Sequence, residues 1–176
     1  RYDALIFSFL TLATRFSASV SIGPDENEFP KYIGRPDFIR GYDRETYAGG
    51  ICETSLSDPQ ACSAVQLLGS RVAFANVELR FPLVRQFTLG LLPISLPPVD
   101  GLFFYDMGAA WSKDQRLMPS RPANYDFAFE RYPLKSYGFG VRLNLFNIAL
   151  IRWDYSIPLD GVNRKGYWFW TLGQSF

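Results

Sequence analysis

The sequence predicts an all-β protein, and more specifically an antiparallel up-and-down transmembrane β-barrel. Apolar residues recur at every second position through several long segments, and the positions between them are mostly small or polar. The connections between these segments alternate between short and long. Strands of a membrane barrel show this pattern, with apolar side chains toward lipid and polar side chains toward the lumen. The chain of 176 residues is long enough for one domain.

The first predicted strand covers residues 5–16, where the alternation is blurred. This region overlaps the longest apolar stretch, residues 4–13, which Ser8 and Thr11 interrupt. The stretch is too short for a membrane-spanning helix, which needs roughly 20 residues. Any membrane contact must therefore be made through strands or through a surface.

The next two predicted strands are residues 72–81 and 102–111. In the first, one face carries Ala73, Ala75, Val77, Leu79 and Phe81, and the other carries Asn76, Glu78 and Arg80. In the second, Asp106 is flanked at two-residue spacing by Phe104 and Gly108. Glu78 therefore lies on a polar face, and Asp106 shares its face with a small residue.

The last three predicted strands are residues 137–145, 150–158 and 167–176. Their apolar faces hold Phe139, Val141, Leu143, Leu145, Ile151, Trp153, Tyr155, Ile157, Trp168, Trp170, Leu172 and Phe176. Their opposite faces hold Gly138, Gly140, Arg142, Asn144, Arg152, Asp154, Ser156, Thr171, Gly173 and Ser175. Segments of this length exceed the five or six residues that are typical of soluble strands.

The aromatic residues of these strands are expected to face lipid. Trp153, Tyr155, Trp168, Trp170 and Phe176 all fall on the apolar phase. A soluble sandwich is the alternative, but its outer faces would carry rows of long polar side chains in place of glycine, serine and asparagine. In a sandwich the same rings would lie in a closed core.

The connections differ strongly in length. Residues 146–147 form a tight turn, whereas the segments 24–64 and 112–134 are long, polar and rich in Gly, Pro, Asp and Arg. The loop at 160–166 falls on the side of the long segments if the strands run up and down in order. The segment 82–100 falls on the short-turn side without being short, so it is expected to hold a short strand or to lie along an interface.

The composition excludes several functional classes. Eighteen basic and seventeen acidic residues leave a net charge of +1, which gives no support to nucleic-acid binding. The chain has no histidine and only two cysteines, so the usual zinc clusters, Ser-His-Asp triads and Cys-His pairs cannot be built. We therefore expect no enzymatic activity, no catalytic residue, no metal and no cofactor. The high apolar content of 48% also excludes disorder.

Six predicted strands cannot close a membrane barrel, because the smallest single-chain version has about 8. An open sheet edge is not viable in lipid. Either two strands are hidden in the remaining segments, or the chain is the C-terminal part of a larger barrel. The second alternative is favoured because the chain begins almost on a strand, without a signal peptide.

Four motifs in order resemble a known family. They are Phe-Ile-Arg-Gly-Tyr at 38–42, Val-Glu-Leu-Arg-Phe-Pro at 77–82, Phe-Tyr-Asp-Met-Gly at 104–108 and Trp-Thr-Leu-Gly-Gln-Ser-Phe at 170–176. The chain is similar here to the BamA/TamA superfamily of outer-membrane assembly and translocation barrels, the bacterial surface antigen family. The resemblance implies that residues 1–176 are the last six or so strands of a barrel of about sixteen. It also implies a long surface loop at about 24–64.

In that family the Arg-Gly-(Phe/Tyr) loop folds back into the lumen, where its arginine meets acidic residues. The resemblance therefore implies a cluster of loop and wall residues, namely Arg40, Gly41, Tyr42, Glu78 and Asp106. A guanidinium can pair two carboxylates through its planar fork, and such pairs are strongest where water is excluded. In the alternative, Arg40 is a solvated loop residue, and the two acids pair with Arg80 or Arg142.

The end of the chain resembles the sorting signal of outer-membrane barrels. Trp170, Leu172, Gly173 and Phe176 fit that pattern. The implied function is to insert or assemble other outer-membrane proteins through a lateral seam at the last strand. The alternatives are a pore for two-partner secretion and a passive anchor for an N-terminal hydrolase domain.

The resemblance also implies the location and the partners. The expected location is the bacterial outer membrane, or an organelle outer membrane of bacterial origin. The expected partners are the lipid bilayer and unfolded or exported outer-membrane proteins, with periplasmic modules or accessory proteins as further candidates.

We predict a disulfide between Cys52 and Cys62. Both lie in the same long loop, ten positions apart, and a cell-surface loop is exposed to an oxidising environment. Alkylation without reductant, followed by mass spectrometry, should leave both residues unlabelled. Labelling of both thiols in native protein would show that they are free, which is the alternative.

Overall fold

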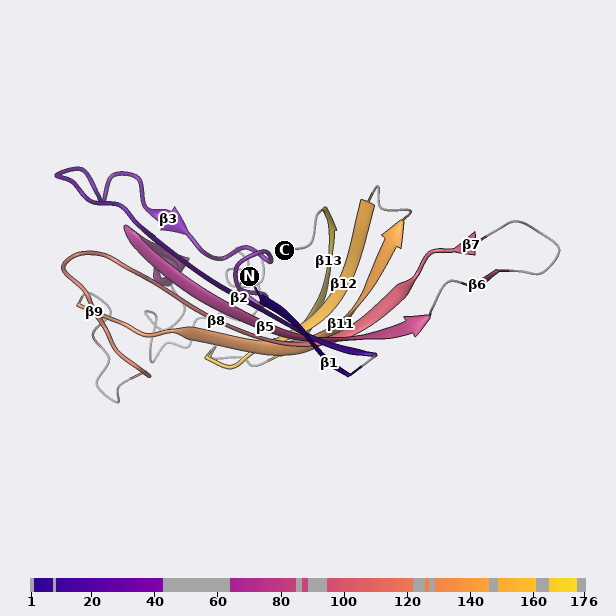
Figure 1. The fold of residues 1–176 in the computed structure, drawn as a ribbon. Coiled ribbons are helices and arrows are strands. Elements are labelled where there is room, and N and C mark those ends of the chain that lie inside the picture. Colours follow the sequence, from indigo (N-terminus) through magenta and orange to yellow (C-terminus); the bar gives the residue numbers. More distant parts are fainter. Residues whose placement is uncertain are drawn as a thin grey trace.

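The computed structural model describes residues 2–7, 9–42, 64–84, 87–88, 95–121, 126, 129–145, 149–160 and 165–173. Its main element is a curved seven-stranded antiparallel sheet in the order β1-β2-β5-β8-β11-β12-β13 (Figure 1). The strands are β1 (Tyr2–Phe7), β2 (Leu10–Val20), β5 (Arg71–Val84), β8 (Val99–Trp111), β11 (Leu134–Leu145), β12 (Ala149–Pro158) and β13 (Tyr167–Gly173). Each strand pairs with the previous main strand of the chain, so the sheet is the wall of an up-and-down barrel.

Short elements lie in the connections. They are β3 (Lys31–Tyr32), the 3₁₀-helix η1 (Ala64–Leu67), β4 (Leu68–Gly69), β6 (Phe87–Thr88), β7 (Ser95–Leu96), β9 (Arg116–Leu117) and β10 (Glu130–Arg131). They form three two-stranded sheets, which pair β3 with β4, β6 with β7 and β9 with β10. None of the described helices is long and apolar enough to cross a membrane.

Five of the predicted strands are confirmed within the described residues, because residues 72–81, 102–111, 137–145, 150–158 and 167–173 lie in β5, β8, β11, β12 and β13. The last prediction extends to residue 176, and residues 174–176 lie outside the described part of the chain. The prediction of one strand over residues 5–16 was wrong. This region forms a hairpin of β1 and β2, in which Phe7 pairs with Leu10. Both strands are apolar and no Gly, Pro, Asn or Asp marks the turn between them, so the sequence pattern hides the hairpin.

The long and short connections lie at opposite ends of the wall. The links from β2 to β5, from β8 to β11 and from β12 to β13 lie at one end, which we call the long-loop end. The links after β1, β5 and β11 lie at the other, the short-turn end.

The segment 82–100 contains the short strands β6 and β7, so the first of its two predicted outcomes is confirmed. Cys52 and Cys62 lie outside the described residues.

The two faces of the wall differ as the alternation predicts. Trp153, Trp168 and Trp170 lie on the convex face, and Trp170 is 73% exposed. Trp153 pairs with Trp170 and Tyr155 pairs with Trp168, so Tyr155 shares this face. These rings do not fill a closed core, as a soluble sandwich would require. Phe176 lies outside the described residues.

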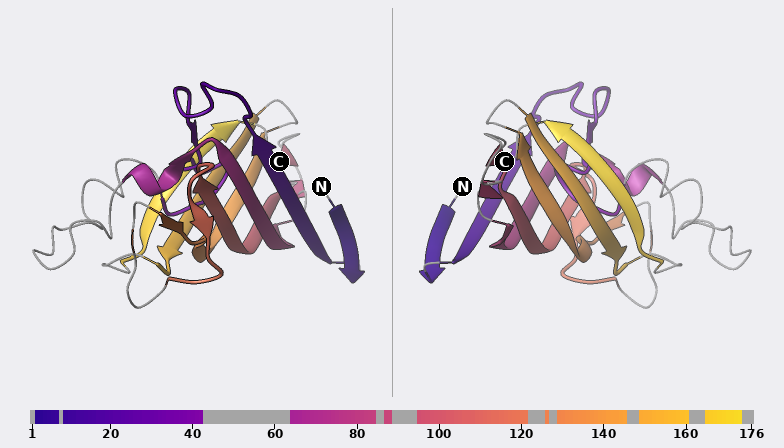
Figure 2. Two further views of the ribbon diagram at one scale, coloured as in Figure 1. Left: turned by 90° about the vertical axis from the view of Figure 1, so that its left-hand side faces the viewer. Right: turned by 90° about the vertical axis from the view of Figure 1, so that its right-hand side faces the viewer.

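The concave face is covered by a segment of the β2–β5 connection. Residues 33–42 follow β3 and lie over the wall (Figures 1 and 2). The buried core lies between this segment and the wall, and it comprises Ile33, Ile39, Tyr42, Leu67, Val72, Phe74, Ala110, Tyr132 and Leu134. Figure 2 also shows β1 and β13 at opposite edges of the sheet. We call residues 33–42 the inserted loop.

The convex face can be tested with a charged substitution. Val141 lies near the middle of β11 and is 39% exposed. A cation near the bilayer midplane costs about 2–4 kcal/mol, so Val141→Arg should lower the free energy of unfolding in liposomes by about that amount. The measurement is urea unfolding of the reconstituted protein.

Leu117→Arg is the matched control for this experiment. Leu117 is 45% exposed but belongs to β9, outside the wall. The same substitution there should change the unfolding free energy by no more than about 0.5 kcal/mol. Equally small effects at both positions would contradict contact between the convex face and lipid.

Candidate functional site

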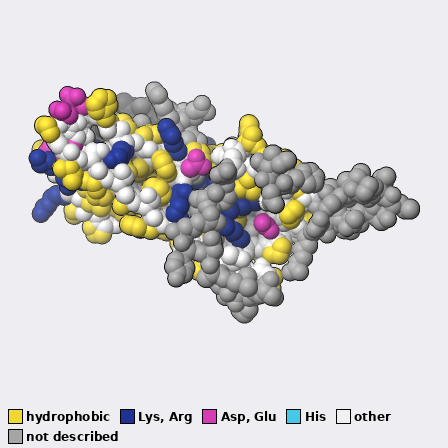
Figure 3. All heavy atoms as spheres, turned by 45° about the horizontal axis from the view of Figure 1, so that its top comes forward, with side chains coloured by type: hydrophobic (Ala, Val, Ile, Leu, Met, Phe, Trp, Pro, Cys, Tyr) yellow, Lys and Arg dark blue, Asp and Glu magenta, His cyan; other side chains and the backbone are white. Residues whose placement is uncertain are grey.

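Charged side chains of four neighbouring strands meet on the concave face of the wall. Glu78 comes from β5, Asp106 from β8, Arg142 from β11 and Asp154 from β12, and all four are buried. The strand period of two points each of them inward. Figure 3 looks obliquely onto this side and shows basic and acidic side chains close together among hydrophobic ones.

Arg40 of the inserted loop reaches into this group of charges. Its Nε and Nη2 donate hydrogen bonds to the two carboxylate oxygens of Asp106, each at 2.6 Å. Its Nη1 donates to Oε1 of Glu78 at 2.8 Å. Its backbone N–H also donates to Asp106, at 3.1 Å. The Arg40 side chain is 1% exposed, so this is a buried, bidentate ion pair with a second carboxylate beside it.

The guanidinium of Arg40 also lies over an aromatic ring. Its central carbon is 3.6 Å from the centroid of the Phe104 ring, which is the geometry of a cation–π contact. Gly138 on the neighbouring strand makes room for that ring, because a Cβ there would lie 2.6 Å from Phe104 Cζ. The small residues of β11 are therefore part of the site, since a larger side chain at 138 would displace Phe104.

Glu78 is shared by several arginines. Arg80 Nη2 lies 2.8 Å from Oε2 of Glu78, and Arg142 Nη2 lies 2.6 Å from the same oxygen. Arg152 is 4.0 Å from Oε1 of Glu78 and pairs with Asp154 at 2.8 Å. Glu78 would therefore keep cationic partners without Arg40.

Asp106 depends much more on the inserted loop. Within the described residues its hydrogen-bond donors are Arg40 and the amide of Asn76, whose Nδ2 lies 2.9 Å from Oδ1. Asn76 is neutral, so Arg40 supplies the charge that compensates this carboxylate. Removing one partner of a buried ion pair typically costs about 3–5 kcal/mol.

Further hydrogen bonds fix the backbone of the inserted loop. Asn76 Nδ2 donates to the carbonyl of Phe38 at 2.8 Å. Arg15 on β2 donates to the carbonyl of Asp37 and, through Nε, to Asn76 Oδ1 at 3.0 Å. The loop is thus bound to β2 and β5 through its main chain, and to β5 and β8 through Arg40.

Tyr42 anchors the loop at a second point, separate from Glu78 and Asp106. Its hydroxyl donates to the carbonyl of Lys135 at 2.7 Å and accepts from the N–H of Asp160 at 3.3 Å. The Asp160 carboxylate in turn accepts from the N–H of Lys135 at 2.7 Å. Tyr42 therefore connects the loop to the start of β11 and to the β12–β13 connection.

Gly41 lies between the two anchors and needs its missing side chain. Its φ of +98° is in the left-handed region, and a Cβ would lie 2.8 Å from Ser156 Oγ. Both observations disfavour any residue with a side chain at this position. Gly41 thus allows Arg40 and Tyr42 to point to different parts of the wall.

The charge state of the loop residues follows from their surroundings. Burial opposes ionisation of Arg40, but Asp106 and Glu78 outweigh it and raise the pKa of Arg40 above its ordinary value. Burial raises the pKa of the Tyr42 phenol. Arg40 is therefore a permanent cation and Tyr42 a neutral hydroxyl at physiological pH.

The structure thus brings Arg40, Glu78 and Asp106 together and places Gly41 and Tyr42 beside them in the loop. The alternative pairing of Glu78 with Arg80 and Arg142 exists as well, in addition to the pair with Arg40. Sequence reasoning missed the hydrogen bonds of Asn76 and Arg15, the cation–π contact of Phe104 and the pair of Arg152 with Asp154. One signal for these contacts was available in the sequence: the residues lie at strand positions that alternate with the apolar, outward-facing ones.

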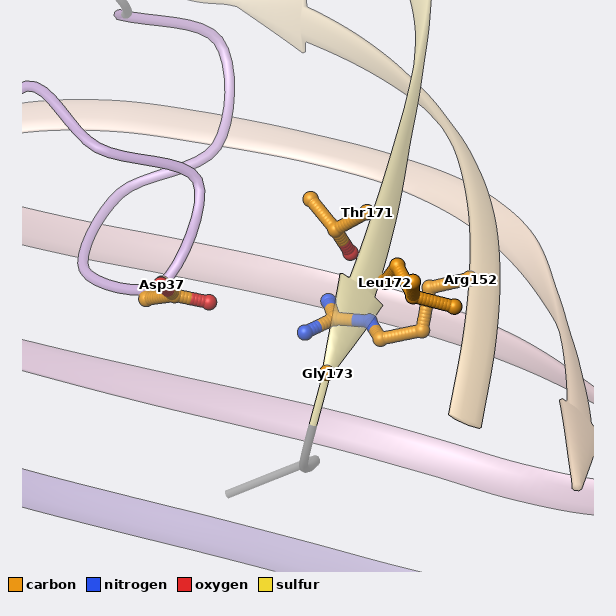
Figure 4. A pocket seen from close by; sticks show the side chains of 5 residues that line it. All are labelled: Asp37, Arg152, Thr171, Leu172 and Gly173. Carbon is orange, nitrogen blue, oxygen red and sulfur yellow. The ribbon is translucent and has the colours of Figure 1, made fainter. Parts of the chain in front are cut away.

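A cavity of about 330 Å³ lies between the inserted loop and the last strand. Its lining residues are Asp37, Arg152, Thr171, Leu172 and Gly173 (Figure 4).

The residues of the predicted terminal signal lie in or after β13. Trp170 and Leu172 belong to the convex face of β13, and Gly173 pairs with Leu150. The remaining residue of the predicted terminal signal, Phe176, is outside the described part of the chain. No group of three His, Cys, Asp or Glu side chains that could hold a metal occurs among the described residues.

Comparisons with known proteins place the chain in a family. A model of the Omp85 superfamily domain matches residues 7–176. Searches of curated proteins and of solved structures gave no match. The superfamily comprises β-barrels of outer membranes that act, without catalysing a reaction, in protein assembly or translocation. The match covers almost the whole chain and agrees with the predicted resemblance, so this protein belongs to the Omp85 superfamily.

Proposed function

We propose that this chain is the C-terminal part of a barrel that inserts other outer-membrane proteins, and that its lateral seam lies along β13. The observation that carries the proposal is the uneven distribution of contacts around the inserted loop. Polar contacts bind the loop to β2, β5, β8 and β11. Toward β13, by contrast, the loop faces a cavity.

The pairing of β13 supports this proposal. Within the described residues, β13 pairs with β12 from Leu150 opposite Gly173 to Ser156 opposite Tyr167. In the described sheet β13 is an edge strand. Unpaired N–H and C=O groups are costly in lipid, so this edge requires another strand. That strand is the closing strand of the barrel at rest, or a strand of an incoming protein during insertion.

The inserted loop has a complementary role in this proposal. Arg40 and Tyr42 hold the loop against the wall on both sides of Gly41, which stiffens β5, β8 and β11. A rigid wall on one side and a weakly held last strand on the other confine opening to the seam. Trp170, Leu172, Gly173 and Phe176 then mark the strand by which the barrel itself is recognised during assembly.

Arg40→Ala tests the role of the loop. This substitution removes the hydrogen-bonded cationic partner of the buried Asp106, so the unfolding free energy should fall by about 3–5 kcal/mol. Insertion of a barrel substrate into liposomes by the full-length protein should fall with it. Arg40→Lys should give an intermediate result, because an ammonium cannot form the bidentate fork.

Arg35→Ala is the matched control, since Arg35 lies in the same loop but is exposed. We expect it to change stability by no more than about 0.5 kcal/mol and to leave insertion unchanged. If the two alanine variants behaved alike, the proposed function of the Arg40 cluster would be refuted.

Site-specific photo-crosslinking tests the seam. A photoreactive residue at Leu172, on the convex face of the edge strand, should capture an inserting outer-membrane protein. The same residue at Val141, on the convex face of the interior strand β11, should capture none. The comparison uses the full-length protein with a translocating substrate.

A third crosslinker position, Asn144 on the concave face of β11, distinguishes the export pore from the passive anchor. Capture at Asn144 without capture at Leu172 would indicate an export pore that passes its substrate through the lumen. Absence of capture at all three positions would indicate a passive anchor. Either result would contradict insertion through a seam at β13.

A further inference from the structure

The convex face of the wall carries charge at one end only. From β2 to β13 the described residues of this face are almost all apolar, small or aromatic. Among them the charged residues are Arg71 and Lys135. Arg71 is the first residue of β5 and Lys135 the second of β11, and both strands begin at the long-loop end. Both charges are therefore positive and lie at the same border of the wall.

The strand register places both side chains on the convex face. Arg71 is opposite Val20 on one side, which is 52% exposed, and opposite Trp111 on the other. Lys135 is opposite Met107, which is 37% exposed. Directly opposed residues of neighbouring antiparallel strands share a face of the sheet. Each cation therefore belongs to the face that carries the exposed apolar side chains.

Carboxylates of the wall do not compensate these two cations. The ion pairs of the described wall residues lie on the concave face, and neither Arg71 nor Lys135 takes part in them. Arg71 is half-buried, and its Nε has no hydrogen-bond acceptor among the described residues. The Asp160 carboxylate accepts from the main-chain N–H of Lys135. An anion from outside the chain would therefore meet two cations that the wall leaves available.

Aromatic side chains border the cations on the apolar side. Trp111 is opposite Arg71. Tyr137 follows Lys135 on the same face and is opposite Tyr105, and both tyrosines are exposed. Amphipathic rings of this kind are typical of the headgroup level of a bilayer, where basic side chains can place their charge in the interface. This border therefore has the composition of a membrane interface.

The opposite border of the convex face is different within the described residues. There the register joins Leu143 to Ile151 and Ile151 to Leu172, and all three side chains are aliphatic. Beyond the wall at the long-loop end both signs of charge occur, since Lys113 is followed by Asp114. An excess of positive charge is thus a property of the convex border at the long-loop end.

We propose that Arg71 and Lys135 bind the phosphate groups of anionic lipids in the leaflet at the long-loop end. The inference rests on the outer-membrane placement of the wall and does not require a seam at β13. A lipid fits better than a protein partner, because its acyl chains would lie along the apolar convex face while its phosphate meets the cations. The Arg71 guanidinium can offer two parallel N–H groups to a phosphate, whereas Lys135 acts as a point charge.

Fluorescence quenching by brominated lipids tests this selectivity. The full-length protein, in a background without other cysteines, carries a fluorophore at Val20→Cys, Met107→Cys or Leu172→Cys and is reconstituted in phosphatidylcholine vesicles. Quenching by brominated phosphatidylglycerol is divided by quenching by brominated phosphatidylcholine at the same mole fraction. This ratio should be about fivefold higher at Val20 and Met107 than at Leu172, because a basic residue near an anionic surface contributes about 1 kcal/mol.

Variants that remove one charge assign the effect to single residues. Arg71→Gln should lower the ratio at Val20 to the value found at the short-turn end, and Lys135→Gln should do the same at Met107. Arg71→Lys keeps the charge and should keep most of the ratio, which separates loss of charge from loss of fold. Arg116→Gln is the matched control, since Arg116 is exposed at the same end but belongs to β9, outside the wall. It should leave both ratios unchanged.

Four other outcomes would each overturn the proposal. Equal ratios at Val20, Met107 and Leu172 would show that the border does not recognise lipid charge. High ratios that persist in Arg71→Gln and Lys135→Gln would assign the preference to other groups. Loss of the preference in inorganic phosphate, compared with chloride at the same ionic strength, would show that the site takes phosphate from solution. Absence of quenching by either lipid at all three positions would refute the membrane placement of the wall itself.

Discussion

The ion pair between Arg40 and Asp106 is the interaction on which the rest of the concave side depends. Asp106 is fully buried, and its charge is acceptable there only if a cation compensates it. Within the described residues that cation comes from a loop about 66 positions earlier in the sequence, not from a neighbouring strand. The wall therefore requires the loop, and the loop holds its path because the wall presents this carboxylate. The many partners of Glu78 make its pair with Arg40 less decisive, since Arg80 and Arg142 remain.

The strands support this pair with residues that carry no charge. Phe104 offers its face to the guanidinium, and Gly138 leaves the space in which the Phe104 ring lies. A positive φ at Gly41 then lets the chain leave the Arg40 site and bring Tyr42 to Lys135. The glycines of this region are therefore structural parts of the ion-pair site. A side chain at Gly138 would displace the Phe104 ring, and one at Gly41 would strain the backbone and collide with Ser156.

Local pattern and tertiary arrangement differ in how far the sequence reveals them. The alternation in residues 72–81 and 137–158 predicts strands, faces and the inward direction of Glu78, because a period of two is a local property. The hairpin at Phe7 and Leu10 escaped prediction, because two apolar strands without a turn residue look like one. Which partners Glu78 and Asn76 choose depends on register and on the loop path, and these are set by contacts between residues far apart in the sequence. The resemblance to a family, and not periodicity, identified Arg40 as the partner of Glu78 and Asp106.

The contacts that stabilise the wall are also the basis of the proposed seam at β13. Hydrogen bonds and ion pairs bind the inserted loop to β2, β5, β8 and β11 and, through Arg40 and Asp154, to β12, so separating any of these strands would also break contacts with the loop. Toward the last strand, by contrast, the loop faces a cavity. Opening between β5 and β8 would break thirteen residue pairs and the contacts of Arg40 with both strands, which is why the proposal places the opening at β13. In this proposal, rigidity in the middle of the wall and opening at its last strand both follow from the position of one loop.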